Sequence, residues 1–341
     1  MQRDNPDDLD LHQFSERLQA RAFDPSCCFL CAKHFDDAHL TNEHVIPKWA
    51  QNRFELWNER LTLLNGTTIP YRLLTVPCCE ECNKYRLQPI ETSISAAIEH
   101  GPESVKALGT NVIFLWLGKI FYGILYRELS LLIDRKDSEG LTIATPELLR
   151  EYEAHLFFLQ QAREKVKLVD FTPGSIYVFR CQTPASPRLH WDICDNIETM
   201  FIAVRMKEVA IIAVLGDGGA QMIYSDIYRK FESLTLHPIQ FRELCAHFSY
   251  RASIATRTPK YITVQGTPHQ VYQMPLGGLS AMPYFQEWDD AIYARFLSYY
   301  TGCPYDTAYQ GPNKVMTWLH DDSGKIRFLD YKQHPFGPHN P

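Results

Sequence analysis

Two pairs of cysteines place the strongest constraint on how this chain folds. Each pair has the spacing Cys-x-x-Cys, and the pairs are Cys28–Cys31 and Cys79–Cys82. Four thiolates from two such turns complete the tetrahedral coordination of Zn²⁺ and close it to other ligands, so the predicted site is structural. The doublets Cys27-Cys28 and Cys78-Cys79 offer a choice of ligand, but only the second cysteine of each gives the two-residue gap. Buried free thiols are the alternative interpretation.

The start of the chain and its apolar stretches indicate a cytoplasmic protein. The acidic start, Met1–Asp8, lacks the basic and then apolar order of a secretory signal. The most apolar stretch, Val112–Ile133, is interrupted by Lys119, Arg127 and Glu128, so it lacks the run of about 20 apolar residues that spans a bilayer. In a reducing compartment, clustered cysteines favour metal ligation over disulfides. We therefore expect a cytoplasmic protein that has no membrane contact.

Length and composition are those of an α+β globular protein with more than one domain. The chain has 341 residues, of which 45% are hydrophobic and 22% are charged. We expect a polar lead over residues 1–26, a compact metal module over residues 27–100, and a larger mixed α+β domain over residues 101–341. The formal net charge of -6 argues against a broadly basic nucleic-acid binder, so any contact with nucleic acid must use a local basic patch.

Short elements are predicted in the first 100 residues. A helix is expected over Leu11–Ala22, before the metal module. Inside the module, Pro47 ends a short strand and Asn65-Gly66 marks a tight turn between two further strands. Pro89 is expected to end or kink the helix that follows the second cysteine pair. The predicted elements are a strand at Glu43–Ile46, a helix at Lys48–Trp57, strands at Arg60–Asn65 and Thr68–Val76, a helix from Cys82 or Asn83, and a helix at Ile90–Glu99.

The remaining residues predict a mixed α+β domain. Apolar residues recur at helical spacing in some segments, and β-branched and aromatic runs mark strands in others. We interpret this domain as a targeting, sensing or oligomerisation unit that contacts a protein partner or a second copy. The predicted helices are Val105–Asp134, Thr145–Ala162, Pro238–Ser249 and Phe285–Tyr300, and the predicted strands are Ser175–Gln182, Thr199–Met206, Val209–Leu215, Ala220–Tyr224, Lys314–Leu319 and Lys325–Leu329.

Three polar residues next to the cysteine pairs are candidates for chemistry. Glu43 and His44 share a strand, so their side chains leave opposite faces unless the strand bulges or ends there. A neutral histidine is suited to accept a proton from water, because its ordinary pKa is about 6.5. Asn83 directly follows the last cysteine and can offer an amide oxygen to Mg²⁺, which keeps several water ligands. The alternatives are a half-buried histidine bonded to backbone and an asparagine that only caps a helix.

Four basic residues near these candidates can bind phosphates. They are Lys48, Arg53, Lys84 and Arg86. Contacts to the phosphate backbone position a nucleic acid without reading its sequence. The alternative is an ordinary solvated surface, because exposed charges are common and nearby glutamates offset part of the positive charge.

In combination, these features resemble the HNH endonucleases, the ββα-metal nuclease family, in the form that carries two zinc-binding Cys-x-x-Cys knuckles. The matching segments are Cys28–Cys31, Glu43–Pro47 and Val76–Asn83, within a region from Cys27 to Glu91. Each motif is weak alone, but the combination is specific. The resemblance implies an N-terminal ββα-metal module with a four-cysteine zinc knuckle.

The resemblance also implies a role for each candidate. His44 would be the general base, Glu43 the first metal ligand, and Asn83 the metal ligand on the helix, where many family members have histidine. The catalytic metal would be Mg²⁺, Mn²⁺ or a similar divalent ion, and the usual substrate is DNA. One position departs from the family: its middle asparagine normally lies about five residues before the second knuckle, where this chain has Leu74.

Two functions follow from these observations. The first is a metal-dependent endonuclease that hydrolyses phosphodiester bonds in DNA. The second is a catalytically inactive zinc-knuckle module that binds nucleic acid or acts as a protein adaptor, because the middle asparagine is missing. We expect the endonuclease.

Overall fold

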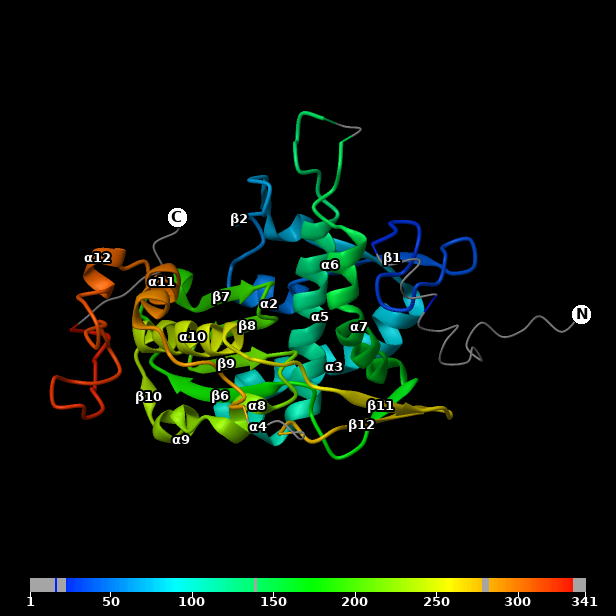
Figure 1. Cartoon of the computed structure of the whole chain (residues 1–341). Helices are drawn as coiled ribbons and strands as arrows, with labels where there is room; N and C mark the ends of the chain where they lie inside the picture. The colour runs from blue at the N-terminus through cyan, green and yellow to red at the C-terminus, as the bar shows by residue number, and fades with distance from the viewer. Residues whose placement is uncertain (1–15, 17–22, 138–139, 278–281, 334–341) are drawn as a thin grey trace, which may run out of the picture. The chain divides into compact units, whose positions relative to one another are not determined.

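The computed structural model describes residue 16 and residues 23–137, 140–277 and 282–333 (Figure 1). The expected α+β architecture is confirmed, because helices alternate with several small sheets. The helix expected at Leu11–Ala22 lies outside the described residues. None of the described helices combines the length and the apolar character needed to cross a membrane.

The described residues form two compact units that are discontinuous in sequence. The first unit contains the residues up to Ser95 together with Leu115–Phe171 and Tyr261–Gln273. The second contains Ala96–Phe114, Thr172–Lys260 and the described residues from Met274 onward. This division differs from the expected boundary at residue 100. The reason is that the middle of the chain packs onto the metal module, as the close approach of Gly123 to Val45 shows.

A strand pair followed by a helix forms the centre of the first unit. Strand β1 (Leu40–His44) pairs antiparallel with β4 (Thr75–Cys79), so that His44 lies opposite Thr75. A π-helix, η2 (Glu81–Leu87), follows β4 and continues into helix α3 (Gln88–Glu99). Pro89 is the second residue of α3, at the change from η2 to α3, where it supplies no backbone N–H but does not end the helical segment. The chain therefore has a ββα arrangement.

Between β1 and β4, fewer residues lie in helices and strands than we predicted. Helix α2 (Lys48–Arg53) ends early, because Glu55 has a positive φ of 59°. Strands β2 (Arg60–Thr62) and β3 (Thr68–Pro70) pair around the expected turn, where Gly66 has φ 75°. The strand expected over residues 68–76 divides into β3, the 3₁₀-helix η1 (Tyr71–Leu73) and β4.

The helix predicted over Val105–Asp134 is two helices. Gly109 adopts a φ of 82° and separates α4 (Pro102–Ala107) from α5 (Thr110–Leu129). The residues of α5 that belong to the first unit are almost all buried. Figure 1 shows α7 (Glu153–Leu159) beside α5, and His155 of α7 lies 3.0 Å from the Gly118 carbonyl.

The rest of the first unit surrounds these helices. Helix α6 (Pro146–Glu151), α7 and the 3₁₀-helix η3 (Gln160–Arg163) replace the single helix expected at Thr145–Ala162. A three-stranded sheet, which the sequence did not predict, has the order β11-β12-β5. Its strands are β5 (Val166–Leu168), β11 (Tyr261–Val264) and β12 (His269–Gln273).

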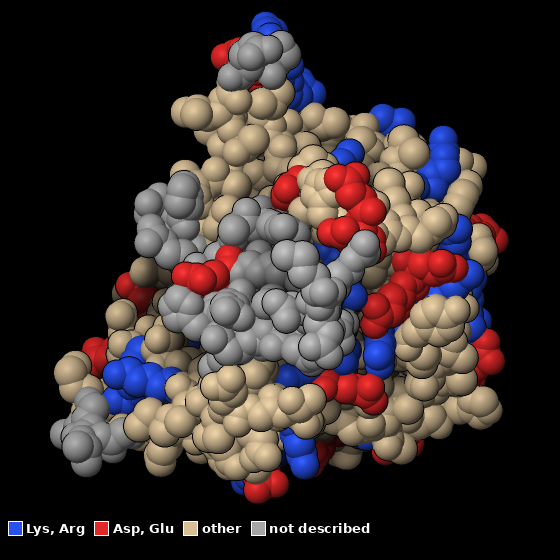
Figure 2. Space-filling view, turned by 90° about the vertical axis from the view of Figure 1, so that its right-hand side faces the viewer, with Lys and Arg blue, Asp and Glu red and all other residues tan. Residues whose placement is uncertain are grey.

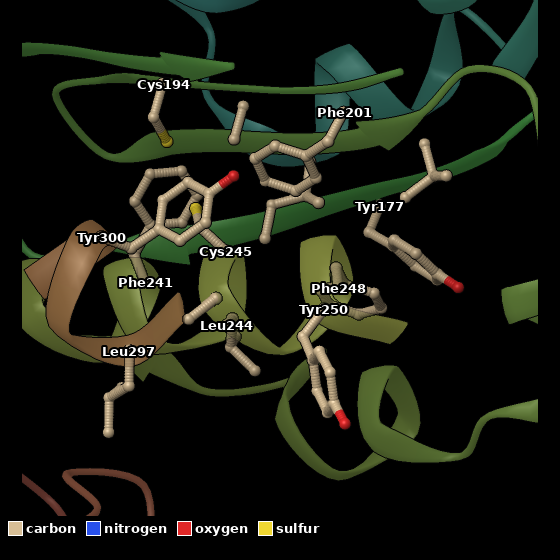
Figure 3. Close-up of a cluster of buried hydrophobic side chains, with 14 of the residues drawn as sticks. Tyr177, Cys194, Phe201, Phe241, Leu244, Cys245, Phe248, Tyr250, Leu297 and Tyr300 are labelled. Carbon is tan, nitrogen blue, oxygen red and sulfur yellow. The ribbon is translucent and has the colours of Figure 1, made fainter. Parts of the chain in front are cut away.

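A five-stranded sheet in the order β10-β6-β9-β8-β7 organises the second unit. Helix α10 (Pro238–Ser253) packs on this sheet and contacts α11 (Asp290–Thr301). Figure 3 shows the apolar side chains between these layers, where Phe248 of α10 lies against Tyr177, with ring centroids 4.4 Å apart. The strands are β6 (Ser175–Cys181), β7 (Trp191–Asn196), β8 (Phe201–Met206), β9 (Val209–Val214) and β10 (Thr235–Leu236), and the smaller helices are η4 (Pro187–Leu189), α8 (Ala220–Tyr224), α9 (Ile227–Phe231) and α12 (Tyr305–Ala308).

Three predictions for this unit were wrong. Residues 220–224 form α8 instead of a strand, because Asp217 accepts backbone hydrogen bonds from Gly219 and Gln221 and so starts a helix. The segments at 314–319 and 325–329 are not strands and form only the isolated bridges Tyr309–Val315 and His320–Ile326.

The close contact between Gly123 and Val45 predicts a stability effect. A Cβ atom at Gly123 would lie 2.9 Å from Cγ2 of Val45, a buried and stiff side chain. We expect Gly123→Ala to lower the free energy of unfolding by about 1 kcal/mol, since overpacking outweighs the better helix propensity of alanine. Urea unfolding measures this change. The double variant Gly123→Ala/Val45→Ala should lose less stability than the sum of the losses in the two single variants, because Val45→Ala removes the methyl groups that crowd the new Cβ atom. Full additivity would contradict this contact.

Buried His155 predicts a pH dependence of stability. Burial lowers the pKa of His155 to about 4, so the folded chain keeps this ring neutral. The unfolded chain takes up a proton below about pH 6.5, and stability should therefore fall as the pH decreases from about 6.5 to about 4. Urea unfolding across this range should show a smaller loss in His155→Asn than in the parent. Equal losses would show that His155 titrates normally in the folded protein.

Candidate functional site

Four cysteine side chains come together in a buried cluster. The Sγ atoms of Cys28, Cys31, Cys79 and Cys82 all lie within 4.8 Å of one another, and Cys31 and Cys79 are 3.7 Å apart. Tetrahedral zinc with Zn–S bonds of about 2.3 Å requires sulfur atoms about 3.8 Å apart. The donor set and its spacing therefore fit a structural metal such as zinc, as the sequence predicted.

The other two cysteines of the doublets lie outside this cluster. The Cys27 thiol points to the Asp24 carboxylate, with Sγ and Oδ2 3.4 Å apart. The Cys78 thiol faces the Cys79 carbonyl and is not among the four sulfur atoms that lie within 4.8 Å of one another. The structure thus resolves the choice of ligand in favour of Cys28 and Cys79.

Backbone contacts connect the first cysteine turn to the strand pair. The Ala32 amide donates to the Cys28 carbonyl, and Ala32 has the positive φ of 54° that a tight turn requires. The Phe29 amide donates to the Pro77 carbonyl of β4 at 2.9 Å. Since β4 pairs with β1, the cysteine cluster fixes the position of the strand that carries His44.

His44 is half-buried at the last position of β1. Its ring stacks on Trp57, with centroids 5.9 Å apart and an interplanar angle of 20°. Burial and the positive charges of Lys48 and Lys119 lower the pKa of His44 below its ordinary value. The imidazole is therefore neutral at neutral pH, as a general base must be.

Glu43 is buried and paired with a lysine that the sequence analysis did not assign to the site. Its carboxylate Oε1 lies 2.5 Å from the Lys119 Nζ of α5. The same Nζ lies 2.7 Å from the Glu91 carboxylate of α3. In the sequence, Lys119 is only a break in an apolar helix. A lysine flanked by apolar residues in such a helix is the signal that a buried carboxylate partner is needed.

Asn83 lies inside η2, where it does not cap a helix. Its amide nitrogen donates to Thr41 Oγ1 at 3.0 Å, and the Thr41 hydroxyl donates to the Cys78 carbonyl. Thr41 and Glu43 lie on one face of β1, because side chains alternate along a strand. The structure therefore brings Asn83 to the Glu43 face, while His44 leaves from the other face at the strand end.

The four candidate phosphate-binding residues have different surroundings. Lys48 is exposed and influences the His44 pKa. Arg53 lies over the Trp49 ring and donates to Ser95. Lys84 pairs with Glu80, and Arg86 pairs with Glu81 and Glu164. Lys48 is therefore the most suitable of the four for a phosphate beside His44.

Charge on the visible surface is mixed in sign. On the face in Figure 2, lysine and arginine side chains are interspersed with aspartate and glutamate. This agrees with the net charge of -6. Any phosphate contact by this chain would therefore be short-ranged.

The second unit contains a cavity of about 350 Å³. Glu243, His247 and Arg251 line it from successive turns of α10. The Glu243 carboxylate accepts hydrogen bonds from the backbone of Trp318 and Leu319, so it holds the wall of the cavity. No local sequence pattern marks this cavity, because its lining comes from separate helices and a loop.

Comparison with known proteins adds no relative. No protein-family model matches the chain, and neither curated proteins nor solved structures include a match. The assignment of a function depends on the geometry above.

Zinc content provides a direct test of the cysteine cluster. We expect one zinc ion per chain in the parent protein, since four thiolates satisfy its coordination. Cys82→Ser should lose this zinc and unfold at a lower temperature, because the binding free energy of a structural zinc is part of the folding free energy. Elemental analysis and thermal unfolding measure both effects. Cys78→Ser is the matched control and should keep its zinc, and equal zinc in the two variants would refute the assignment.

Proposed function

We propose that this protein is a metal-dependent endonuclease that hydrolyses phosphodiester bonds in DNA. The main support for this proposal comes from the end of β1, where His44, with a neutral and half-buried imidazole, directly follows Glu43, with a buried carboxylate. The ββα arrangement and the four-cysteine cluster, whose sequence motifs resemble those of the HNH endonucleases, support it further.

His44 is the general base in this proposal. Because its pKa lies below the ordinary value, its ring nitrogen is free to take a proton from a water molecule aligned with the scissile phosphorus. Stacking on Trp57 holds the plane of the ring. A base that is already oriented avoids part of the entropy cost of reaching the reactive geometry.

In this proposal, Glu43 and Asn83 would hold the divalent cation. Lys119 contacts Oε1 of Glu43, and Asn83 uses its amide nitrogen on Thr41, so its amide oxygen would be the ligand. A carboxylate and an amide oxygen suit Mg²⁺ or Mn²⁺, which fill their other positions with water and phosphate. The cation would stabilise negative charge on the phosphate and on the leaving 3′ oxygen.

The competing proposal is a catalytically inactive zinc-knuckle module that binds nucleic acid or acts as a protein adaptor. Two observations favour it. Leu74 occupies the position of the family's middle asparagine and is buried, and the Glu43 carboxylate already has a cationic partner in Lys119. Binding of DNA without cleavage would support this interpretation.

The second unit would then be a sensing unit. The sequence predicted targeting, sensing or oligomerisation for this unit. The cavity beside α10 supports sensing. The cavity has the size of a small-molecule site, since such sites measure about 300–1,000 Å³.

Cleavage of plasmid DNA tests the proposed function. Purified protein with Mg²⁺ or Mn²⁺ should convert supercoiled plasmid to the nicked or linear form. His44→Ala should lower the rate at least about 100-fold, because general-base catalysis contributes about 10²–10⁴-fold. His100→Ala removes an exposed histidine elsewhere in the chain and should leave the rate unchanged. Plasmid binding without nicking in either metal would favour the adaptor.

A further inference from the structure

A buried ammonium lies at the centre of the proposed site. Lys119 is 2% exposed, and four oxygen atoms surround its Nζ. We call these four atoms the oxygen cage. They are Oε1 of Glu43 at 2.5 Å, Oε1 of Glu91 at 2.7 Å, the His44 carbonyl oxygen at 2.9 Å and the Val45 carbonyl oxygen at 3.3 Å.

Charge balance explains why this lysine stays ionised. Burial opposes the charge of Lys119, and the carboxylates of Glu43 and Glu91, at 2.5 Å and 2.7 Å from its Nζ, offset this cost. Two carboxylates and one ammonium leave the cage with a formal charge of −1. An isolated buried charge would be strongly unfavourable, so each of the three groups depends on the others.

The cage joins three elements at the reactive end of β1. Glu43, His44 and Val45 come from the end of β1 and the residue after it, Glu91 comes from α3, and Lys119 comes from α5. One ammonium therefore contacts both the side chain of the proposed metal ligand and the main chain of the proposed base. A shift of Lys119 would move both groups together.

We propose that Lys119 is a positioning residue of the nuclease site. This inference rests on the proposed function. Its ammonium fixes the Glu43 carboxylate, which would bind the catalytic cation, and it fixes the His44 main chain. By neutralising one of the two carboxylates, it also limits how tightly the site binds divalent ions. Hydrogen bonds that orient a metal-binding carboxylate are a common requirement for catalysis at metal sites.

The oxygen cage has the chemistry of a cation site in its own right. Its atoms lie 2.5–3.3 Å from Nζ, and carboxylate and carbonyl oxygens bind divalent ions at about 2.0–2.6 Å. Removal of the ammonium would leave two carboxylates facing each other without a counter-charge. We therefore expect Lys119→Met to gain divalent-ion affinity and to lose cleavage at the same time.

Opposite changes in these two properties separate positioning from a purely structural role. Electron paramagnetic resonance measures Mn²⁺ binding to the full-length, zinc-containing chain, and plasmid nicking at saturating Mn²⁺ measures the rate. We expect Lys119→Met to bind Mn²⁺ at least about tenfold more tightly and to nick at least about tenfold more slowly. Lys119→Met/Glu91→Gln removes one carboxylate and should return the Mn²⁺ affinity toward that of the parent.

Unchanged or weaker Mn²⁺ affinity in a folded Lys119→Met variant would overturn the proposal, as would an unchanged nicking rate. If Lys119→Met loses its zinc or its cooperative unfolding, Glu91→Gln provides the test. That variant keeps Lys119 and should bind Mn²⁺ several-fold more weakly, because the cage loses a negative charge. An unaltered affinity would overturn the proposal.

If the parent nicks no plasmid, the proposed function fails, together with the positioning role. The Mn²⁺ titrations would still show whether Lys119 limits ion binding.

Discussion

The first unit depends on bringing together four thiols from two distant parts of the chain. Cys31 and Cys79 are 48 residues apart in sequence, yet their sulfur atoms lie 3.7 Å apart. Closing a loop of this length costs entropy, and a metal bound to the four thiolates would offset that cost. Because Cys79 ends β4, the same cluster sets the register of β1, which ends at His44. A small strand pair alone would be only marginally stable.

A buried ion pair is a second constraint on the position of β1, in addition to the cysteine cluster. The cluster fixes β1 at its Leu40 end, which lies opposite Cys79. Lys119 fixes the other end through Glu43 and the His44 carbonyl. The two anchors differ in kind, since metal–sulfur bonds at the four cysteines would give stability, whereas a buried ion pair gives a defined geometry at some cost in desolvation. The His44 end of the strand therefore depends on charge as well as on packing.

Local patterns predicted those features that neighbouring residues determine. The Cys-x-x-Cys spacing identified the correct cysteines, and Asn65-Gly66 identified a real turn. The helix predicted at Pro238–Ser249 is α10, which begins at Pro238 after His237. The α+β class and the absence of a membrane-spanning helix among the described residues also agree with expectation.

Features that depend on distant partners were missed. The residues that surround Lys119 in the sequence do not identify Glu43 and Glu91 as its partners, because these two residues lie on other elements. The discontinuous make-up of the two units has no local signal for the same reason, since it follows from packing between segments that are distant in sequence. The break at Gly109 depends on a positive φ, and a glycine inside an apolar periodic run does not show whether the backbone adopts one.

Anomalous diffraction from crystals grown with Mn²⁺ would test the central claim most directly, because one experiment locates both metals. The account predicts a zinc peak about 2.3 Å from the Sγ atoms of Cys28, Cys31, Cys79 and Cys82. It also predicts a manganese peak within about 2.5 Å of a Glu43 carboxylate oxygen. The absence of zinc from the thiols, or manganese bound only at sites remote from Glu43, would contradict it.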